Sequence, residues 1–100
     1  MTTGSIQLVA DIGATHARFA LASEGALTGA KTVLATAQHR QAADLVRSAL
    51  EALSVDRVDE ACFAVAGPVS AGVVEVTNGG LRFSVSELSG AFAAPVRLVN

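Results

Sequence analysis

The chain has 100 residues, of which 51% are hydrophobic and 16% are charged, and this is the composition of a single globular domain rather than of a disordered segment. Its formal net charge is −2 and its seven Lys and Arg residues form no basic run, so nucleic-acid binding and attachment to a membrane surface are not expected. A single Cys excludes an intramolecular disulfide, and the lack of a signal-peptide pattern and of a long apolar stretch predicts a cytoplasmic protein.

Three β-strands joined by short turns are expected in the first third of the chain. Apolar residues alternate with their neighbours over residues 5–11, 16–22 and 30–36, which is the period of a strand. A loop at residues 11–15 separates the first two runs, and the turn Ser23-Glu24-Gly25 follows the second. Short connections of this kind predict an N-terminal antiparallel three-strand meander.

The rest of the chain alternates between helical and strand patterns. Apolar residues recur at spacings of three and four over residues 40–53, which predicts an amphipathic helix. Short runs at 61–66, 73–76 and 96–99 predict strands, and residues 77–80 predict a turn. Ser84 and Glu87 have the spacing of a capping box, which predicts the start of a second helix that ends before Pro95.

This order of elements predicts an α/β fold in which two helices pack on a mixed sheet. Binding sites in such folds lie at the carboxyl ends of the strands. The chain stops at Asn100, where its last predicted strand would meet a loop, whereas domain boundaries usually fall in exposed linkers. We therefore expect the chain to be a fragment of a longer protein.

The loop at residues 11–15 is the segment best suited to chemistry. It lacks the G-x-G-x-x-G pattern and the following helix of a dinucleotide-binding fold. Gly13 permits a tight turn whose amides point at an anion, the Thr15 hydroxyl can donate to a phosphate oxygen, and Asp11 suits the water shell of Mg²⁺. The alternative is that Asp11 and Thr15 only stabilise the turn through local hydrogen bonds.

Four segments of the chain resemble one known family, in the same order. The pattern D-x-G-x-T-x-x-R, formed by Asp11, Gly13, Thr15 and Arg18, resembles the first phosphate motif of the sugar kinase/Hsp70/actin superfamily. The stretch around it is similar to bacterial glucokinases of the non-ROK type. Segments 63–69, 77–88 and 96–100 resemble that family's A-x-A-G-P-V, T-N-x-x-W-x-F-S-x-x-E-L and V-x-L-[IL]-N-D patterns.

The resemblance implies a sheet of the RNase H-like, actin-like ATPase type and the ATP-dependent phosphorylation of glucose to glucose 6-phosphate. It assigns residues 1–100 to the N-terminal small, phosphate-binding domain, with a C-terminal domain of the same protein absent from this chain. Asn100 and Asn78 would contact glucose, and Asp11 would hold Mg²⁺ through water. The general base is expected just after Asn100, so the chain alone would be inactive. The implied ligands of the ATP phosphates are Ala10, Asp11, Ile12, Gly13, Ala14 and Thr15.

Three positions depart from the family's usual residues. Ala14 replaces a Gly and adds a methyl group where phosphate approaches, His16 replaces an Asn, and Leu81 stands where the family has Trp. These departures leave two alternatives open: a noncatalytic ATP-binding or regulatory module of the same superfamily, and a kinase for a different sugar. Arg18 is interpreted as structural and His39 as a surface residue, and exposed apolar surface would permit a homodimer.

Overall fold

The computed structural model describes residues 5–76 and 81–100, which form a five-stranded sheet, a two-stranded sheet and two α-helices. No helix in these ranges is long and apolar enough to cross a membrane. The elements in chain order are β1 (Ile6–Ile12), β2 (His16–Ser23), β3 (Ala26–Ala35), the 3-10 helix η1 (Thr36–Gln38), α1 (Ala42–Ala52), β4 (Glu60–Val65), β5 (Val73–Glu75), β6 (Arg82–Ser84), α2 (Val85–Phe92) and β7 (Val96–Val99).

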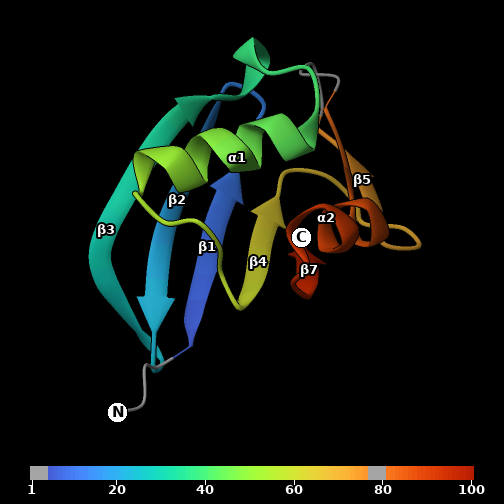
Figure 1. Cartoon of the computed structure of the whole chain (residues 1–100). Helices are drawn as coiled ribbons and strands as arrows, with labels where there is room; N and C mark the ends of the chain where they lie inside the picture. The colour runs from blue at the N-terminus through green and yellow to red at the C-terminus, as the bar shows by residue number, and fades with distance from the viewer. Residues whose placement is uncertain (1–4, 77–80) are drawn as a thin grey trace.

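The main sheet has the strand order β3-β2-β1-β4-β7, and most of it is visible behind α1 (Figure 1). β2 pairs antiparallel with β1 on one side and with β3 on the other. β4 lies parallel to both of its neighbours, β1 and β7. The predicted mixed α/β fold with two helices is confirmed, and three parallel strands end at one edge of the sheet.

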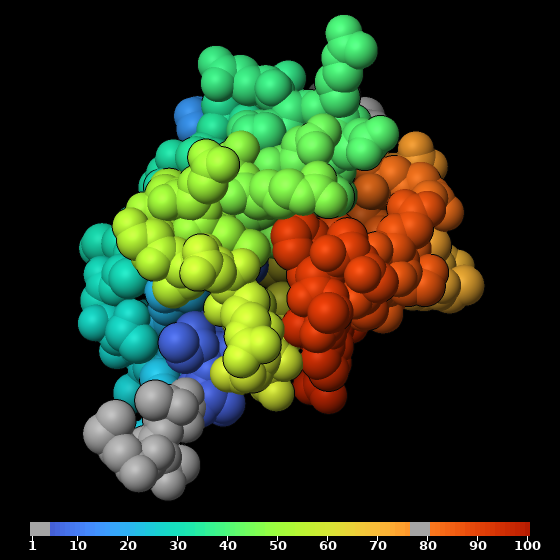
Figure 2. Space-filling view, viewed as in Figure 1, coloured from blue at the N-terminus to red at the C-terminus, as the bar shows by residue number. Residues whose placement is uncertain are grey.

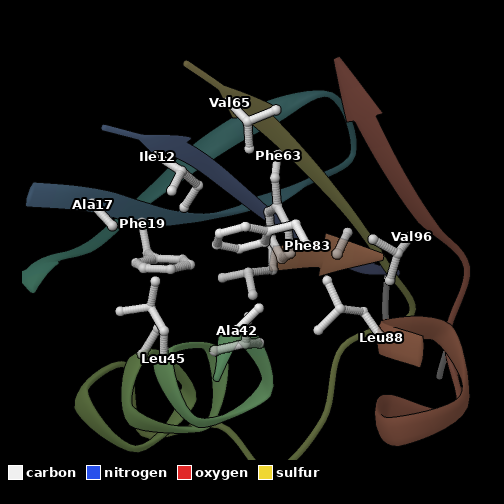
Figure 3. Close-up of a cluster of buried hydrophobic side chains, with 14 of the residues drawn as sticks. Ile12, Ala17, Phe19, Ala42, Leu45, Phe63, Val65, Phe83, Leu88 and Val96 are labelled. Atoms are coloured by element: carbon white, nitrogen blue, oxygen red, sulfur yellow. The ribbon is translucent and has the colours of Figure 1, made fainter. Parts of the chain in front are cut away.

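The hydrophobic core lies between the main sheet and the two helices (Figure 3). Phe63 of β4 is at its centre, with only 1% of its surface exposed. The Phe63 ring lies 6.1 Å from that of Phe19 and 6.4 Å from that of Phe83, measured between centroids, and both pairs are edge-to-face. This is the geometry that the ring quadrupoles favour. The three rings thereby join β2 of the main sheet to β6 of the small sheet.

Both helices cover the same face of the main sheet. α1 buries Leu45, Val46 and Ala49, at the spacings of three and four that predicted it. The two helices touch each other, because the Arg47 guanidinium of α1 lies 5.5 Å from the centroid of the Phe92 ring in α2. Their atoms meet in front of the sheet (Figure 2). One face of the sheet is therefore enclosed.

The opposite face of the main sheet is open in the described part of the chain. A broad hollow of about 700 Å³, lined mostly by apolar groups, lies on this side over β1, β2 and β3. Two large apolar side chains border it with high exposure, Leu27 at 70% and Val33 at 57%. The open face also carries Asp11 at the end of β1, next to the loop of interest.

The third strand is longer than predicted. It begins at Ala26, directly after the turn, whereas the sequence pattern placed its start at residue 30. Residues 28–30 lie opposite the single residue Leu21, and Gly29 has a φ of +99°, so the strand contains a bulge. The bulge breaks the alternation of apolar residues, and this is why the first part of the strand was not recognised.

The short strand β6 was not predicted, because the capping pattern indicated only a helix start. Ser84 Oγ accepts a hydrogen bond from the Glu87 amide at 3.3 Å, which confirms the cap of α2. The Glu87 carboxylate binds the Arg82 guanidinium at 3.1 Å, so the return bond expected of a capping box is not part of the described structure. The turn predicted at residues 77–80 lies outside the described residues.

We predict that Phe63→Ala lowers the free energy of unfolding by about 3–5 kcal/mol, because it leaves a cavity between the sheet and the helices. Val33→Ala removes an apolar side chain from the exposed face and should cost less than about 1 kcal/mol. The measurement is urea unfolding followed by far-ultraviolet circular dichroism, since the chain has no Trp or Tyr for fluorescence. Equal losses for the two variants would contradict the central position of Phe63.

Candidate functional site

Three loops meet at the edge of the sheet where the parallel strands end. The loop at residues 13–15 follows β1, Ala66 and Gly67 follow β4, and Asn100 follows β7. Because β1, β4 and β7 are parallel neighbours, their carboxyl ends lie side by side. In Figure 1 this edge is marked by the arrowheads of β1 and β4. The sheet topology therefore brings together the two ends of the sequence that carry candidate ligands.

The loop after β1 is a tight turn closed by its own backbone. The Gly13 amide donates to the carbonyl oxygen of His16 at 2.9 Å. A Cβ atom on residue 13 would lie 3.1 Å from that same oxygen, which is closer than an ordinary contact. Glycine is thus favoured by a close approach of two backbone segments rather than by its φ angle.

Thr36, the first residue of η1, fastens this loop from the inside. Its hydroxyl donates to the Gly13 carbonyl oxygen at 2.9 Å, and its amide donates to the Thr15 carbonyl oxygen at 2.9 Å. The residue is 0% exposed. Sequence reasoning placed Thr36 at the end of a strand and missed its role, because its contacts join positions 23 residues apart and leave no local pattern.

The six candidate phosphate ligands differ in what they present at the surface. Asp11 and Thr15 are exposed, and Gly13 contributes backbone only. Ile12 is 0% exposed and its side chain belongs to the core, so only its main chain can contribute to a site. Ala10 and Ala14 are half-buried and pack against the core. The methyl group of Ala14, which was expected where phosphate approaches, is partly buried and packs against the core.

Asp11 stands beside Arg18, its partner in the register of β1 and β2. Both side chains are exposed and both line the hollow on the open face of the sheet. Within the described ranges, no three His, Cys, Asp or Glu side chains form a metal-binding group. One exposed carboxylate still fits Mg²⁺ held mainly by water, because this ion keeps several waters and uses one or two carboxylates.

Asn100 is held by the loop after β4. Its side-chain amide donates to the Gly67 carbonyl oxygen. Next to it, the Ala66 amide donates to the Ile12 carbonyl oxygen at 3.1 Å, at the entrance of the first loop. Backbone groups of two adjacent residues, Ala66 and Gly67, therefore connect the end of β1 to the residue that follows β7. The second candidate sugar ligand, Asn78, lies outside the described residues.

Three further residues are placed by the structure. Leu81, which stands at a position of Trp in the similar family, is 1% exposed and belongs to the core. His16 is exposed at the start of β2. The prediction of a surface role for His39 was wrong, because the ring is half-buried and bonded at both nitrogens, to the Ala35 carbonyl at 3.0 Å and to the Ser48 hydroxyl at 3.1 Å.

Comparisons with known proteins agree with this fold. A model of the glucokinase family matches residues 8–100. The glucokinase of Marinobacter nauticus is 37% identical over 93 residues, which are 92% of this chain and 29% of that protein. A crystal structure of glucokinase from an Antarctic psychrotroph is 35% identical, with a TM-score of 0.84 over 98% of this chain and 33% of its own.

A second solved structure extends the comparison to a sugar complex. The glucokinase from Balamuthia mandrillaris, determined in complex with glucose, is 26% identical to this chain, with a TM-score of 0.63. The match covers 97% of this chain and 30% of that one. The chain thus spans about a third of the length of the proteins that it matches.

We predict opposite effects of one substitution at two glycines. Gly13→Ala should lower the free energy of unfolding by about 1 kcal/mol, because the added methyl group presses on the His16 carbonyl and loosens the turn. Gly90→Ala, in α2, adds a methyl group into open space and should raise stability by about 0.5–1 kcal/mol. Urea unfolding of both variants provides the test. Stabilisation by Gly13→Ala would contradict the close approach described for the loop.

Proposed function

The chain belongs to the glucokinase family, and from this premise we propose that the whole protein transfers the γ-phosphoryl group of ATP to the 6-hydroxyl of glucose. The resemblance read from the sequence is confirmed by the family model and by the relatives. One observation carries the proposal to this chain: the loop at residues 13–15 and Asn100 lie at the same edge of the sheet, joined through Ala66 and Gly67.

The phosphate side of the proposed site is the loop and its entrance. Ala10 to Thr15 would line the ATP phosphates, with the backbone amides and the Thr15 hydroxyl donating to phosphate oxygens. The exposed carboxylate of Asp11 would hold Mg²⁺ through its waters. When bound, Mg²⁺ neutralises charge on the transferred phosphoryl group. Without a cation, the Asp11 carboxylate would repel the phosphates. We therefore propose that Asp11 acts together with Mg²⁺.

The sugar side of the proposed site begins at Asn100. With its amide nitrogen held by the Gly67 carbonyl, the side-chain oxygen of Asn100 is left to accept a hydrogen bond from a sugar hydroxyl. Asn78 is proposed as a second contact. An acidic residue directly after Asn100 would serve as the general base that takes the proton of the attacking hydroxyl. A carboxylate at that position would support a kinase, and its absence would support a noncatalytic module.

We assign residues 1–100 to the small, phosphate-binding domain of a two-domain kinase with an RNase H-like, actin-like ATPase fold. The remaining sugar and adenine contacts would come from the second domain, and closure of the two domains would exclude water. The 100 residues alone would therefore not turn over. We also propose a cytoplasmic location, because the proposed reaction uses ATP. The open apolar face of the main sheet is a surface through which the protein could self-associate.

The test is ATP-dependent phosphorylation of glucose by the whole protein, with detection of glucose 6-phosphate. We expect turnover by the wild type and a loss of at least about a hundredfold in kcat/KM for Asp11→Ala, because a charged group next to the phosphates is removed. Asp56→Ala, which removes an exposed carboxylate from a distant loop, is the matched control and should leave the rate unchanged.

Other outcomes separate the alternatives. Folded protein that binds ATP and phosphorylates none of glucose, mannose and fructose would support the noncatalytic module. Turnover on mannose or fructose without turnover on glucose would support a kinase for another sugar. Equal activity of Asp11→Ala and wild type would remove Asp11 from the phosphate site.

A further inference from the structure

We propose that Thr36 is a positioning residue of the phosphate site, which sets the direction of the loop amides by holding the loop carbonyls. The proposal rests on the proposed function of the loop at residues 13–15 as the ATP-phosphate site. It concerns a residue outside that loop, on η1, that would not touch the nucleotide. Thr36 would act on ATP only through the backbone of the loop.

The first step is the pair of hydrogen bonds that Thr36 makes. Its hydroxyl holds the Gly13 carbonyl and its amide holds the Thr15 carbonyl, each at 2.9 Å. Thr36 itself is 0% exposed, whereas Gly13 is half-buried and Thr15 is exposed, so the two bonds are shielded from water on the Thr36 side. Two carbonyl groups of one three-residue loop are therefore turned inward, toward η1. Removal of the Thr36 hydroxyl is unfavourable, because it leaves the Gly13 carbonyl oxygen without its partner in a part-buried position.

The second step concerns the amides of the same loop. The Gly13 amide is used within the turn, where it donates to His16. No partner within the described residues accepts from the Ala14 amide or from the Thr15 amide. Consecutive free amides of this kind form an anion-binding site. The Gly13 carbonyl shares its peptide group with the Ala14 amide, and the Thr15 carbonyl belongs to the peptide group after the Thr15 amide, so the contacts that turn the two carbonyls inward leave the two amides free for a phosphate.

The third step is that η1 itself is braced. His39, directly after η1, bonds to the Ala35 carbonyl on one side of it and to Ser48 of α1 on the other. The brace connects the segment that carries Thr36 to the helix that covers the core. Arg40 follows His39 and is exposed, and no ion pair involving His39 or Arg40 occurs in the described ranges. Thr36 thus belongs to a fixed segment, as a positioning residue must.

The test uses two substitutions at one position in the whole protein. Thr36→Val keeps the shape of the side chain and the main-chain bond to Thr15, and removes only the hydroxyl that holds Gly13. Thr36→Ser keeps the hydroxyl and removes a methyl group. We expect Thr36→Val to weaken Mg·ATP binding and to raise the KM for ATP about tenfold, while the KM for glucose at saturating ATP stays within about twofold.

The conservative variant and a control define a positioning role. Thr36→Ser should retain the wild-type KM for ATP within about twofold. This should hold even if the loss of the methyl group lowers the unfolding midpoint of the variant below that of the wild type. Thr32→Val makes the same chemical change in β3, away from the loop, and should leave both KM values unchanged. Equal increases of KM for ATP in the Ser and Val variants would overturn the proposal, because the hydroxyl would then not be the active group.

A measurement on the wild type keeps the proposal testable if Thr36→Val does not fold. Amide hydrogen exchange of Ala14 and Thr15 should slow when Mg·ATP binds, and exchange that stays unchanged would overturn the proposal. Protein that binds Mg·ATP but does not phosphorylate glucose would contradict the proposed function alone, since the affinity of the Thr36 variants can still be compared. Protein that binds no Mg·ATP would overturn both.

Discussion

The parallel pairing of β4 with β1 on one side and with β7 on the other is the constraint from which the site follows. Parallel strands need crossovers, and here the crossovers are α1 and α2, which both lie on one face and enclose the core around Phe63. The same pairing aligns the carboxyl ends of the three strands. Residues that are nearly ninety positions apart in the chain, Asp11 and Asn100, consequently end at the same edge.

In the site proposed at that edge, most of the candidate ligands are backbone groups. The loop after β1 offers amides rather than cationic side chains, and the segment after β4 supplies the Ala66 amide and the Gly67 carbonyl, which bond to β1 and to Asn100. Backbone groups are positioned by the sheet, so they need little reorganisation when a ligand binds. Such a site tolerates changes of side chain, and this explains why Ala14, whose methyl group packs on the core, is compatible with the loop.

The sequence predicted the elements whose signals are local and left out those that depend on distant contacts. α1 follows from its apolar spacing, and Asp11 and Thr15, both exposed in the structure, were predicted as site residues because their loop carries a compact motif. Thr36 was missed because a threonine near a strand end is common and its partners are in another hairpin. The length of β3 was missed because its bulge interrupts the alternation on which strand recognition depends.

The bulge in β3 affects how this edge of the main sheet can pair with other protein chains. β3 is a long strand at the edge of the main sheet, and an edge strand with unpaired backbone groups invites pairing with other chains and the growth of fibrils. The bend at Gly29 interrupts the straight row of donors and acceptors, and Lys31 places a charge beside the bend. The irregularity that hid this strand from pattern recognition is thus a feature of the kind by which edge strands avoid pairing with other chains.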